Sequence, residues 1–166
     1  MAVYDLDKLI SETRRLAADY RRATGKSLAV SSEIAKHDAC VQLQLEPVNE
    51  ASGGYDALGQ AAPWQGLRIQ VKGRAIFDEG KGGQRIGQLK LDKEWDAVVL
   101  VLMDEAFSPV EMYLAGRHDI VDAMENDTSK RRNRGAMSVA KFKHIAQRVW
   151  TADEGRVATA LDTRQT

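Results

Sequence analysis

The sequence contains one cysteine and no long apolar run, which narrows the classes of protein that it can encode. A single thiol, Cys40, excludes a disulfide framework and a cysteine-based metal site. The longest apolar stretch, Ala97 to Met103, is far shorter than the roughly 20 residues that a membrane-spanning helix needs. The first residues, MAVYDLDKL, lack the basic and then apolar pattern of a signal peptide. We therefore expect a cytoplasmic protein with no membrane partner.

Charge of one sign is not in excess either, because 24 Lys and Arg residues balance 24 Asp and Glu residues. The net charge therefore does not indicate a polyanionic partner. It does not exclude one, since a site for nucleic acid can carry both signs. The densest basic run is Lys130 to Arg134, and such a run is by itself more typical of a solvated surface than of a binding patch.

The chain length of 166 residues suits one compact domain. We predict a single domain over residues 1–150 and a polar tail over 151–166. Helical spacing of apolar residues predicts helices at 5–23, from Ser31 until Pro47, at 117–125 and at 137–150. Alternating or continuous apolar residues predict strands at 55–58, 67–72, 95–103 and 110–115. This order of elements predicts an α/β domain with a mixed sheet of about four strands.

One set of polar residues lies on elements that can bring the side chains together. Glu33 falls in the first turn of a predicted helix, Asp56 follows Gly53-Gly54 on a short strand, and Gln70 and Lys72 alternate with apolar residues on the next strand. If the two strands pair, Asp56, Gln70 and Lys72 share the polar side. Other motifs fail: the GKGG segment at 80–83 lacks the spacing of a phosphate-binding loop, no Gly-x-Ser-x-Gly occurs, and the histidines have no metal-ligand spacing.

The segments EIAKHDACVQLQL, GYDAL and IQVKGR resemble the pattern of the PD-(D/E)XK nuclease superfamily. In that family a helix carries a Glu, a strand carries the Asp, and the adjacent strand carries an acidic-x-Lys pair. The resemblance covers roughly residues 30–115 and implies a restriction-endonuclease-like, three-layer α/β/α fold with a mixed sheet flanked by helices. Gln70 stands where the family pattern has an acid, as in branches that resemble type IV restriction enzymes. A carboxamide oxygen still binds a hard cation but adds no negative charge.

The resemblance implies a metal-dependent endonuclease that hydrolyses DNA phosphodiester bonds. Glu33, Asp56, Gln70 and Lys72 are then the catalytic residues. A Mg²⁺ or Mn²⁺ ion held by Asp56, Gln70, Glu33 and the Val71 carbonyl would polarise the phosphate and lower the pKa of a bound water. Lys72 would orient that water or stabilise charge that develops on the phosphate.

The expected partner is DNA. Contacts to its backbone are expected from five basic residues: Arg74, Lys130, Arg131, Arg132 and Arg134. By analogy with the fold alone, a homodimer that brings two sites to two strands is a further expectation, with the apolar surfaces of the first and last helices as candidate contacts.

Two alternatives stay open. The first alternative to the enzyme is a catalytically inactive nuclease-fold subunit, which binds DNA or assists assembly in a defence or mobile-element system. In that protein Gln70 would mark weak affinity for metal. The second alternative is an α/β interaction module with no role on nucleic acid. Each residue also has an ordinary structural explanation: Asp56 can turn the chain after Gly-Gly, Lys72 can be an exposed strand residue, and Glu33 favours a helix N-terminus.

Overall fold

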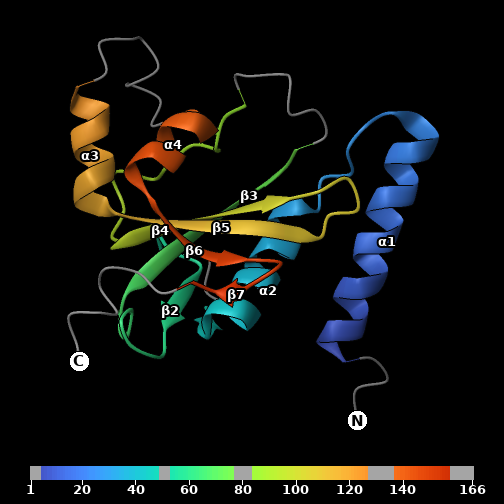
Figure 1. Ribbon diagram of the computed structural model, residues 1–166, viewed down its shortest axis with the longest axis horizontal. Helices are drawn as coiled ribbons and strands as arrows, with labels where there is room; N and C mark the ends of the chain where they lie inside the picture. Colours follow the sequence, from blue (N-terminus) through green and yellow to red (C-terminus); the bar gives the residue numbers. More distant parts are fainter. Residues whose placement is uncertain (1–4, 49–52, 77–83, 127–136, 158–166) are drawn as a thin grey trace.

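The computed structural model describes residues 5–48, 53–76, 84–126 and 137–157. In these ranges seven strands form one mixed sheet in the order β1 to β7, and four helices pack around it (Figure 1). The structure therefore confirms an α/β fold, with more strands than the predicted four or so. The three additional strands are β1 (Leu45–Pro47), β6 (Gln147–Thr151) and β7 (Gly155–Arg156), none longer than 5 residues.

The other elements lie close to their predicted ranges. The helices are α1 (Leu6–Thr24), α2 (Ser31–Leu43), α3 (Arg117–Glu125) and α4 (Val139–Ile145). The remaining strands are β2 (Ala57–Gly59), β3 (Arg68–Ala75), β4 (Ala97–Met103) and β5 (Pro109–Gly116). Neighbouring strands are antiparallel, except that β3 and β4 run parallel to each other.

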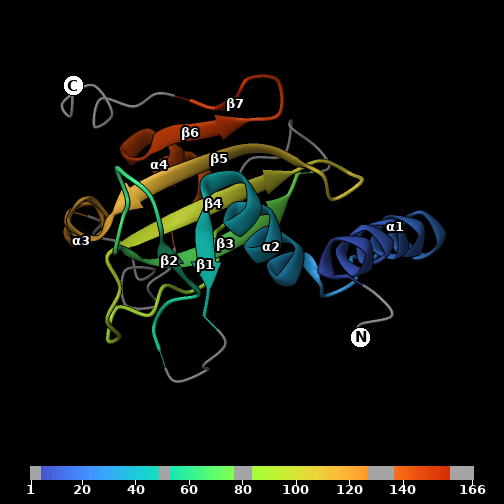
Figure 2. The same ribbon diagram turned by 90° about the horizontal axis from the view of Figure 1, so that it is seen from below.

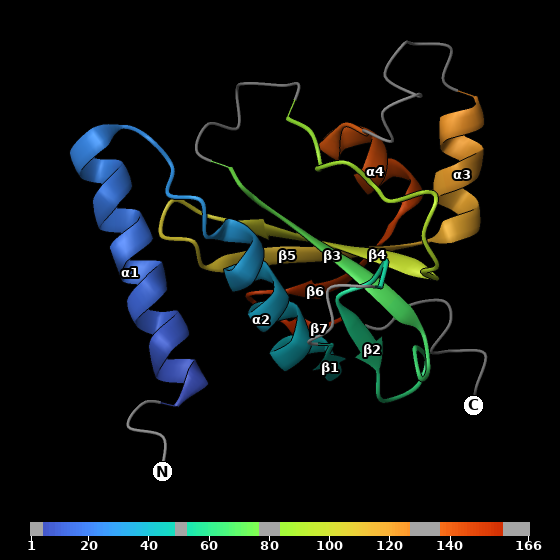
Figure 3. The ribbon, with the colours of Figure 1, turned by 180° about the vertical axis from the view of Figure 1, so that it is seen from behind.

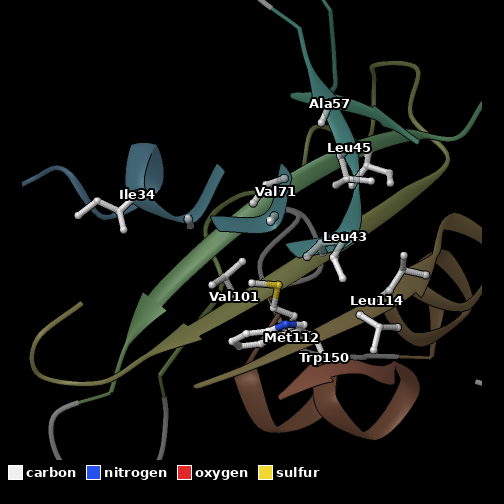
Figure 4. Close-up of a cluster of buried hydrophobic side chains, with 14 of the residues drawn as sticks. Ile34, Leu43, Leu45, Ala57, Val71, Val101, Met112, Leu114 and Trp150 are labelled. Carbon is white, nitrogen blue, oxygen red and sulfur yellow. The ribbon is translucent and has the colours of Figure 1, made fainter. Parts of the chain in front are cut away.

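The sheet curls around α2, which contacts both β1 and β7 at the two ends of the strand order (Figure 2). Its inner face and α2 share one apolar cluster, in which Leu43, Val71 and Met112 converge (Figure 4). The outer face packs against α3 and α4 in a second cluster that includes Val98 and Phe142. All seven residues of β4 are buried, as expected for a strand covered on both faces.

The prediction of one helix over residues 137–150 is wrong. Helix α4 ends at Ile145, and β6 follows at once and pairs with β5. The physical reason is that Phe142 packs in the cluster on the outer face, whereas Val149 packs in the cluster on the inner face. Thr151, which was expected in the polar tail, completes β6, and a turn leads from it to Gly155 and Arg156 in β7. Residues 158–166 lie outside the described ranges.

A buried ion pair connects α1 to α2. The guanidinium of Arg14 donates to both carboxylate oxygens of Asp38, at 2.8 and 3.0 Å, and also to the carbonyl of Phe107. Asp38 is only 6% exposed, so its buried carboxylate needs the counter-charge of Arg14. Figure 3 shows α1 next to α2 at one end of the molecule, and α1 buries only Ala17 and Ala18 there. No helix in the described part of the chain is both long and apolar enough to cross a membrane.

We predict that Arg14→Leu lowers the free energy of unfolding by about 3 kcal/mol, because it leaves the buried Asp38 carboxylate without its counter-charge. Urea denaturation of the full chain measures this loss. The matched control is Arg15→Leu, which removes the same charge from an exposed position of the same helix and should change stability by less than about 0.5 kcal/mol. Equal effects of the two substitutions would show that the ion pair does not hold α1 in place.

Candidate functional site

Asp56 lies immediately before β2 and is fixed against the edge of β3. Its backbone N–H donates to the carbonyl of Ile69 at 2.8 Å, and its Oδ2 accepts from the Val71 N–H, also at 2.8 Å. Strand β2 pairs with β3 only at Ala57 and Leu58, so the carboxylate takes the place of the next strand residue on this edge. The second oxygen, Oδ1, is left to face the ammonium group of Lys36 at 3.6 Å.

Gln70 is a buried polar residue without a hydrogen-bond partner. Its side chain is in β3, the residue is 2% exposed, and neither Oε1 nor Nε2 bonds to any described residue. A buried polar group left unpaired costs about 1–3 kcal/mol, so such groups in native proteins often mark a ligand position. Both polar atoms of the carboxamide are therefore buried and unpaired among the described residues.

Lys72 and Arg74 follow Gln70 on the same face of β3, as the alternation of strand residues predicts. The Lys72 ammonium donates to the carbonyl of Gln88 at 3.0 Å, and the Arg74 guanidinium donates through Nε to the carbonyl of Arg85. Burial lowers the pKa of Lys72, and the positive charges of Lys90, Arg74 and Lys36 lower it further, while the negative charge of Asp56 opposes them. Burial also lowers the pKa of the neighbouring Arg74 guanidinium.

These residues line one cavity of about 250 Å³ between α2, the loop that enters β2, the strand β3 and the segment 87–90. Its lining contains one acidic residue, Asp56, and four basic ones: Lys36, Lys72, Arg74 and Lys90. The structure thus brings together Asp56, Gln70, Val71, Lys72 and Arg74, which the sequence singled out. The excess of positive charge suits a ligand that carries negative charge.

Glu33 is close to the cavity but does not line it. Its side chain is 69% exposed, and its Oε1 lies 3.5 Å from the Lys36 ammonium, the same group that faces Asp56. Lys36 therefore connects the two carboxylates. Sequence reasoning missed it, although Glu33 and Lys36 are one helical turn apart and so had to share a face. No comparable signal existed for Lys90, whose position depends on the path of the chain between β3 and β4.

The residues that line the cavity offer carboxylate, amide and carbonyl oxygens, which are the ligand types that a hard divalent cation prefers. Asp56 and Gln70, whose Oε1 has no partner, are among the lining residues, and so is Val71, whose side chain packs into the core. The described residues contain no group of three or more His, Cys, Asp or Glu side chains that could hold a metal ion. A cation here would therefore depend on amide and backbone oxygens as well as on Asp56.

Two further sequence candidates can now be placed. Lys130, Arg131, Arg132 and Arg134 lie outside the described residues, so their contacts with DNA stay a prediction. Cys40 is partly buried against the core around α2, in keeping with a packing role. Burial and then the nearby Asp56 charge raise the pKa of its thiol to about 11, with Lys36 opposing, so it is protonated at neutral pH and does not act as a nucleophile.

Comparison with known proteins does not assign this site. No model of a protein family matches the chain, and no curated protein matches its sequence. The function therefore has to be argued from the geometry and charge of the cavity.

We predict that Asp56→Asn lowers the pKa of Lys72 further, because the Asp56 charge is the influence that opposes the effect of burial on this lysine. Titration of the lysine side-chain resonances by heteronuclear NMR measures the change. Glu33→Gln is the matched control: it removes an equal charge that does not act on Lys72 and should leave the titration unchanged. A Lys72 pKa that stays constant or rises in Asp56→Asn would contradict the described cavity.

Proposed function

We propose that the chain is a metal-dependent endonuclease that hydrolyses phosphodiester bonds in DNA. The observation that carries this proposal is the buried carboxamide of Gln70, which lacks a partner and lines the same cavity as Asp56 and Lys72. A neutral oxygen ligand for a cation, a carboxylate and a lysine ammonium group in one cavity are groups that metal-assisted hydrolysis of a phosphodiester can use.

The proposal includes a restriction-endonuclease-like fold. Helix α2 carries Glu33, Asp56 immediately precedes β2, and the antiparallel neighbour β3 carries Gln70 and Lys72. This order of elements supports the fold, as does the presence of helices on both faces of the sheet. The four-stranded core of that fold would correspond to β2 to β5, the strands that the sequence predicted.

Each residue has a defined role in the proposed reaction. A Mg²⁺ or Mn²⁺ ion, held by Asp56, Gln70 and the Val71 carbonyl with Glu33 contributing through water, would polarise the phosphate and lower the pKa of a bound water. The hydrogen bond from the Val71 N–H keeps one Asp56 oxygen in place and leaves the other for the cation. Lys72 stabilises negative charge that develops on the phosphate, since its ammonium group is already half-buried beside the site.

We predict that the full chain nicks supercoiled plasmid in the presence of Mg²⁺ or Mn²⁺. Asp56→Asn and Lys72→Ala should each slow nicking by at least about 100-fold, because each removes a charge from the reacting centre. Gel analysis of plasmid conversion over time measures the rates.

The matched controls are Asp119→Asn and Lys26→Ala, which remove the same charges from exposed positions outside the cavity. These two variants should nick at the wild-type rate. Equal nicking by all five proteins, each verified as folded by circular dichroism, would attribute the activity to a contaminant and reject the proposal.

The charge of the cavity favours one alternative, a catalytically inactive subunit of the same fold that binds DNA or assists assembly. Four basic residues and one acidic residue line the cavity, which suits a phosphate better than an isolated cation. The excess of positive charge also lowers the affinity for metal that the Gln70 site can reach. This alternative predicts DNA binding with no effect of Mn²⁺ on stability.

A substitution at Gln70 separates the two. We predict that Gln70→Leu raises the free energy of unfolding in EDTA by about 1–2 kcal/mol, because it replaces two unpaired buried polar atoms by apolar ones of similar volume. If Gln70 binds metal, Mn²⁺ raises the melting temperature of the wild type but not that of Gln70→Leu. An Mn²⁺ effect of equal size in both proteins would remove Gln70 from the metal site, and no effect in either would favour the inactive subunit.

The remaining partners stay predictions. A homodimer through the last helix has little support, since Val139 and Phe142 of α4 are buried in the core of the single chain. The first helix offers exposed apolar residues, among them Leu6 and Leu16, each 60% exposed. DNA as the substrate rests on the sequence and on the charge of the cavity. The cytoplasm as the location rests on the sequence alone.

A further inference from the structure

One wall of the cavity is a short segment without regular structure that is nevertheless fixed in place. Ile86 and Leu89 are 1% and 2% exposed and anchor the segment in the apolar cluster under α3 and α4. The Ile86 N–H also donates to the carbonyl of Met137 at 3.0 Å. Gly87 lies between the two anchors and lines the cavity. Its backbone therefore forms a rigid part of the wall.

Two basic side chains of β3 reach this wall on either side of Gly87. The Arg74 guanidinium donates through Nε to the carbonyl of Arg85, and the Lys72 ammonium donates to the carbonyl of Gln88. Arg74 also donates through Nη1 to the carbonyl of Gly73. Among the described residues these bonds leave Nη2 without an acceptor, next to Gly87.

The absence of a side chain at Gly87 leaves a space of a defined size. A Cβ atom built there would lie 3.1 Å from Arg74 Nη2 and 3.9 Å from Lys72 Nζ. The first distance is shorter than an ordinary contact of a carbon atom, so a side chain at residue 87 would crowd Arg74 Nη2, whereas glycine leaves room beside it for a ligand. Gly87 is not among the glycines with a positive φ, so its backbone does not require glycine. The open space is therefore the distinctive property of this residue.

Other groups that line the cavity also favour the binding of an anion next to Gly87. The Gln70 carboxamide, 2% exposed, lacks a partner and lines the same cavity, where its Nε2 can donate. Lys90 adds a further positive charge to the lining. The positive charges repel one another, and a bound anion would relieve that repulsion.

We propose that Arg74, Lys72 and the open space at Gly87 form an oxyanion subsite that holds one phosphate of a nucleic-acid strand. The identity of the ligand rests on the proposed function, whereas the subsite itself does not require a metal or any reaction. Arg74 Nη2 and Lys72 Nζ bind the phosphate oxygens from two sides, and the Gly87 backbone allows the oxygens to approach. Such charge-assisted hydrogen bonds are among the stronger polar contacts in proteins.

The test uses the full chain in EDTA, so that no cleavage occurs. The probes are a fluorescein-labelled 20-base-pair DNA duplex, followed by fluorescence anisotropy at several salt concentrations, and inorganic phosphate, followed by the backbone amide resonance of Gly87. We expect Gly87→Ala to weaken duplex binding by about 10-fold, since the added methyl group would crowd Arg74 Nη2 and displace it from its place beside Lys72 Nζ. Arg74→Gln should weaken it similarly and reduce the salt slope by about one, as expected for the loss of one phosphate contact.

Gly116→Ala is the matched control, because its Cβ would meet nothing within 4 Å and lies away from the cavity. It should leave duplex affinity within about twofold of the wild type. Arg74→Gln does not alter the backbone, so it keeps the test decisive if Gly87→Ala unfolds. Wild-type affinity for the duplex in both folded Gly87→Ala and Arg74→Gln would overturn the subsite, as would a wild type that binds neither probe.

The outcomes separate the subsite from the nuclease. Plasmid nicking by the wild type, together with unchanged duplex binding in both variants, would reject the subsite and keep the enzyme. Duplex binding that both variants lose, in a protein that does not nick, would keep the subsite and reject the enzyme. A Gly87 resonance that responds to inorganic phosphate in a chain that binds no duplex would make free phosphate the ligand and overturn the assignment to nucleic acid.

Discussion

The arrangement of the site depends on the hydrogen bond between the Asp56 carboxylate and the Val71 N–H. Strand β2 is too short to cover the edge of β3, and this carboxylate satisfies the first amide that β2 leaves open. The bond holds one oxygen of Asp56 on the strand and directs the other into the cavity, towards Lys36. A structural requirement of the sheet edge, that its buried amides find acceptors, thus places a carboxylate beside Gln70.

Close packing of α2 on β3 determines which basic group meets that carboxylate. A Cβ atom at Gly73 would lie 2.5 Å from the Cβ of Ala35, so only a glycine allows the helix to approach the strand this closely. Ala35 is followed by Lys36, whose ammonium group then reaches between Asp56 and Glu33. The site therefore combines an open strand edge with a tightly packed helix, and both follow from small residues and short elements.

The sequence could predict the elements with a clear period and the residues they carry. The helical spacing of apolar residues in α1, the alternation in β3 and the continuous apolar run of β4 each indicate one type of structure, and the structure confirms them. Gln70, Lys72 and Arg74 share a face because strand residues alternate. The periodicity of apolar residues does not predict the strand at residues 147–151, because their pattern continues that of the preceding helix and also fits a helix. Gly87 could not be predicted, because its role depends on the irregular path that brings it opposite β3.

The balanced charge of the whole chain conceals an uneven local distribution. Equal numbers of acidic and basic residues give a net charge of zero, yet the cavity contains four basic residues for one acidic residue. A divalent cation entering alone would add to this excess, and its binding there is opposed by Lys36 and Lys72. A phosphate that enters with the cation offsets both, so the two ligands would bind more tightly together than apart. The proposed function would thus explain the neutral Gln70, because a phosphate of the substrate would supply the negative charge that the protein itself does not.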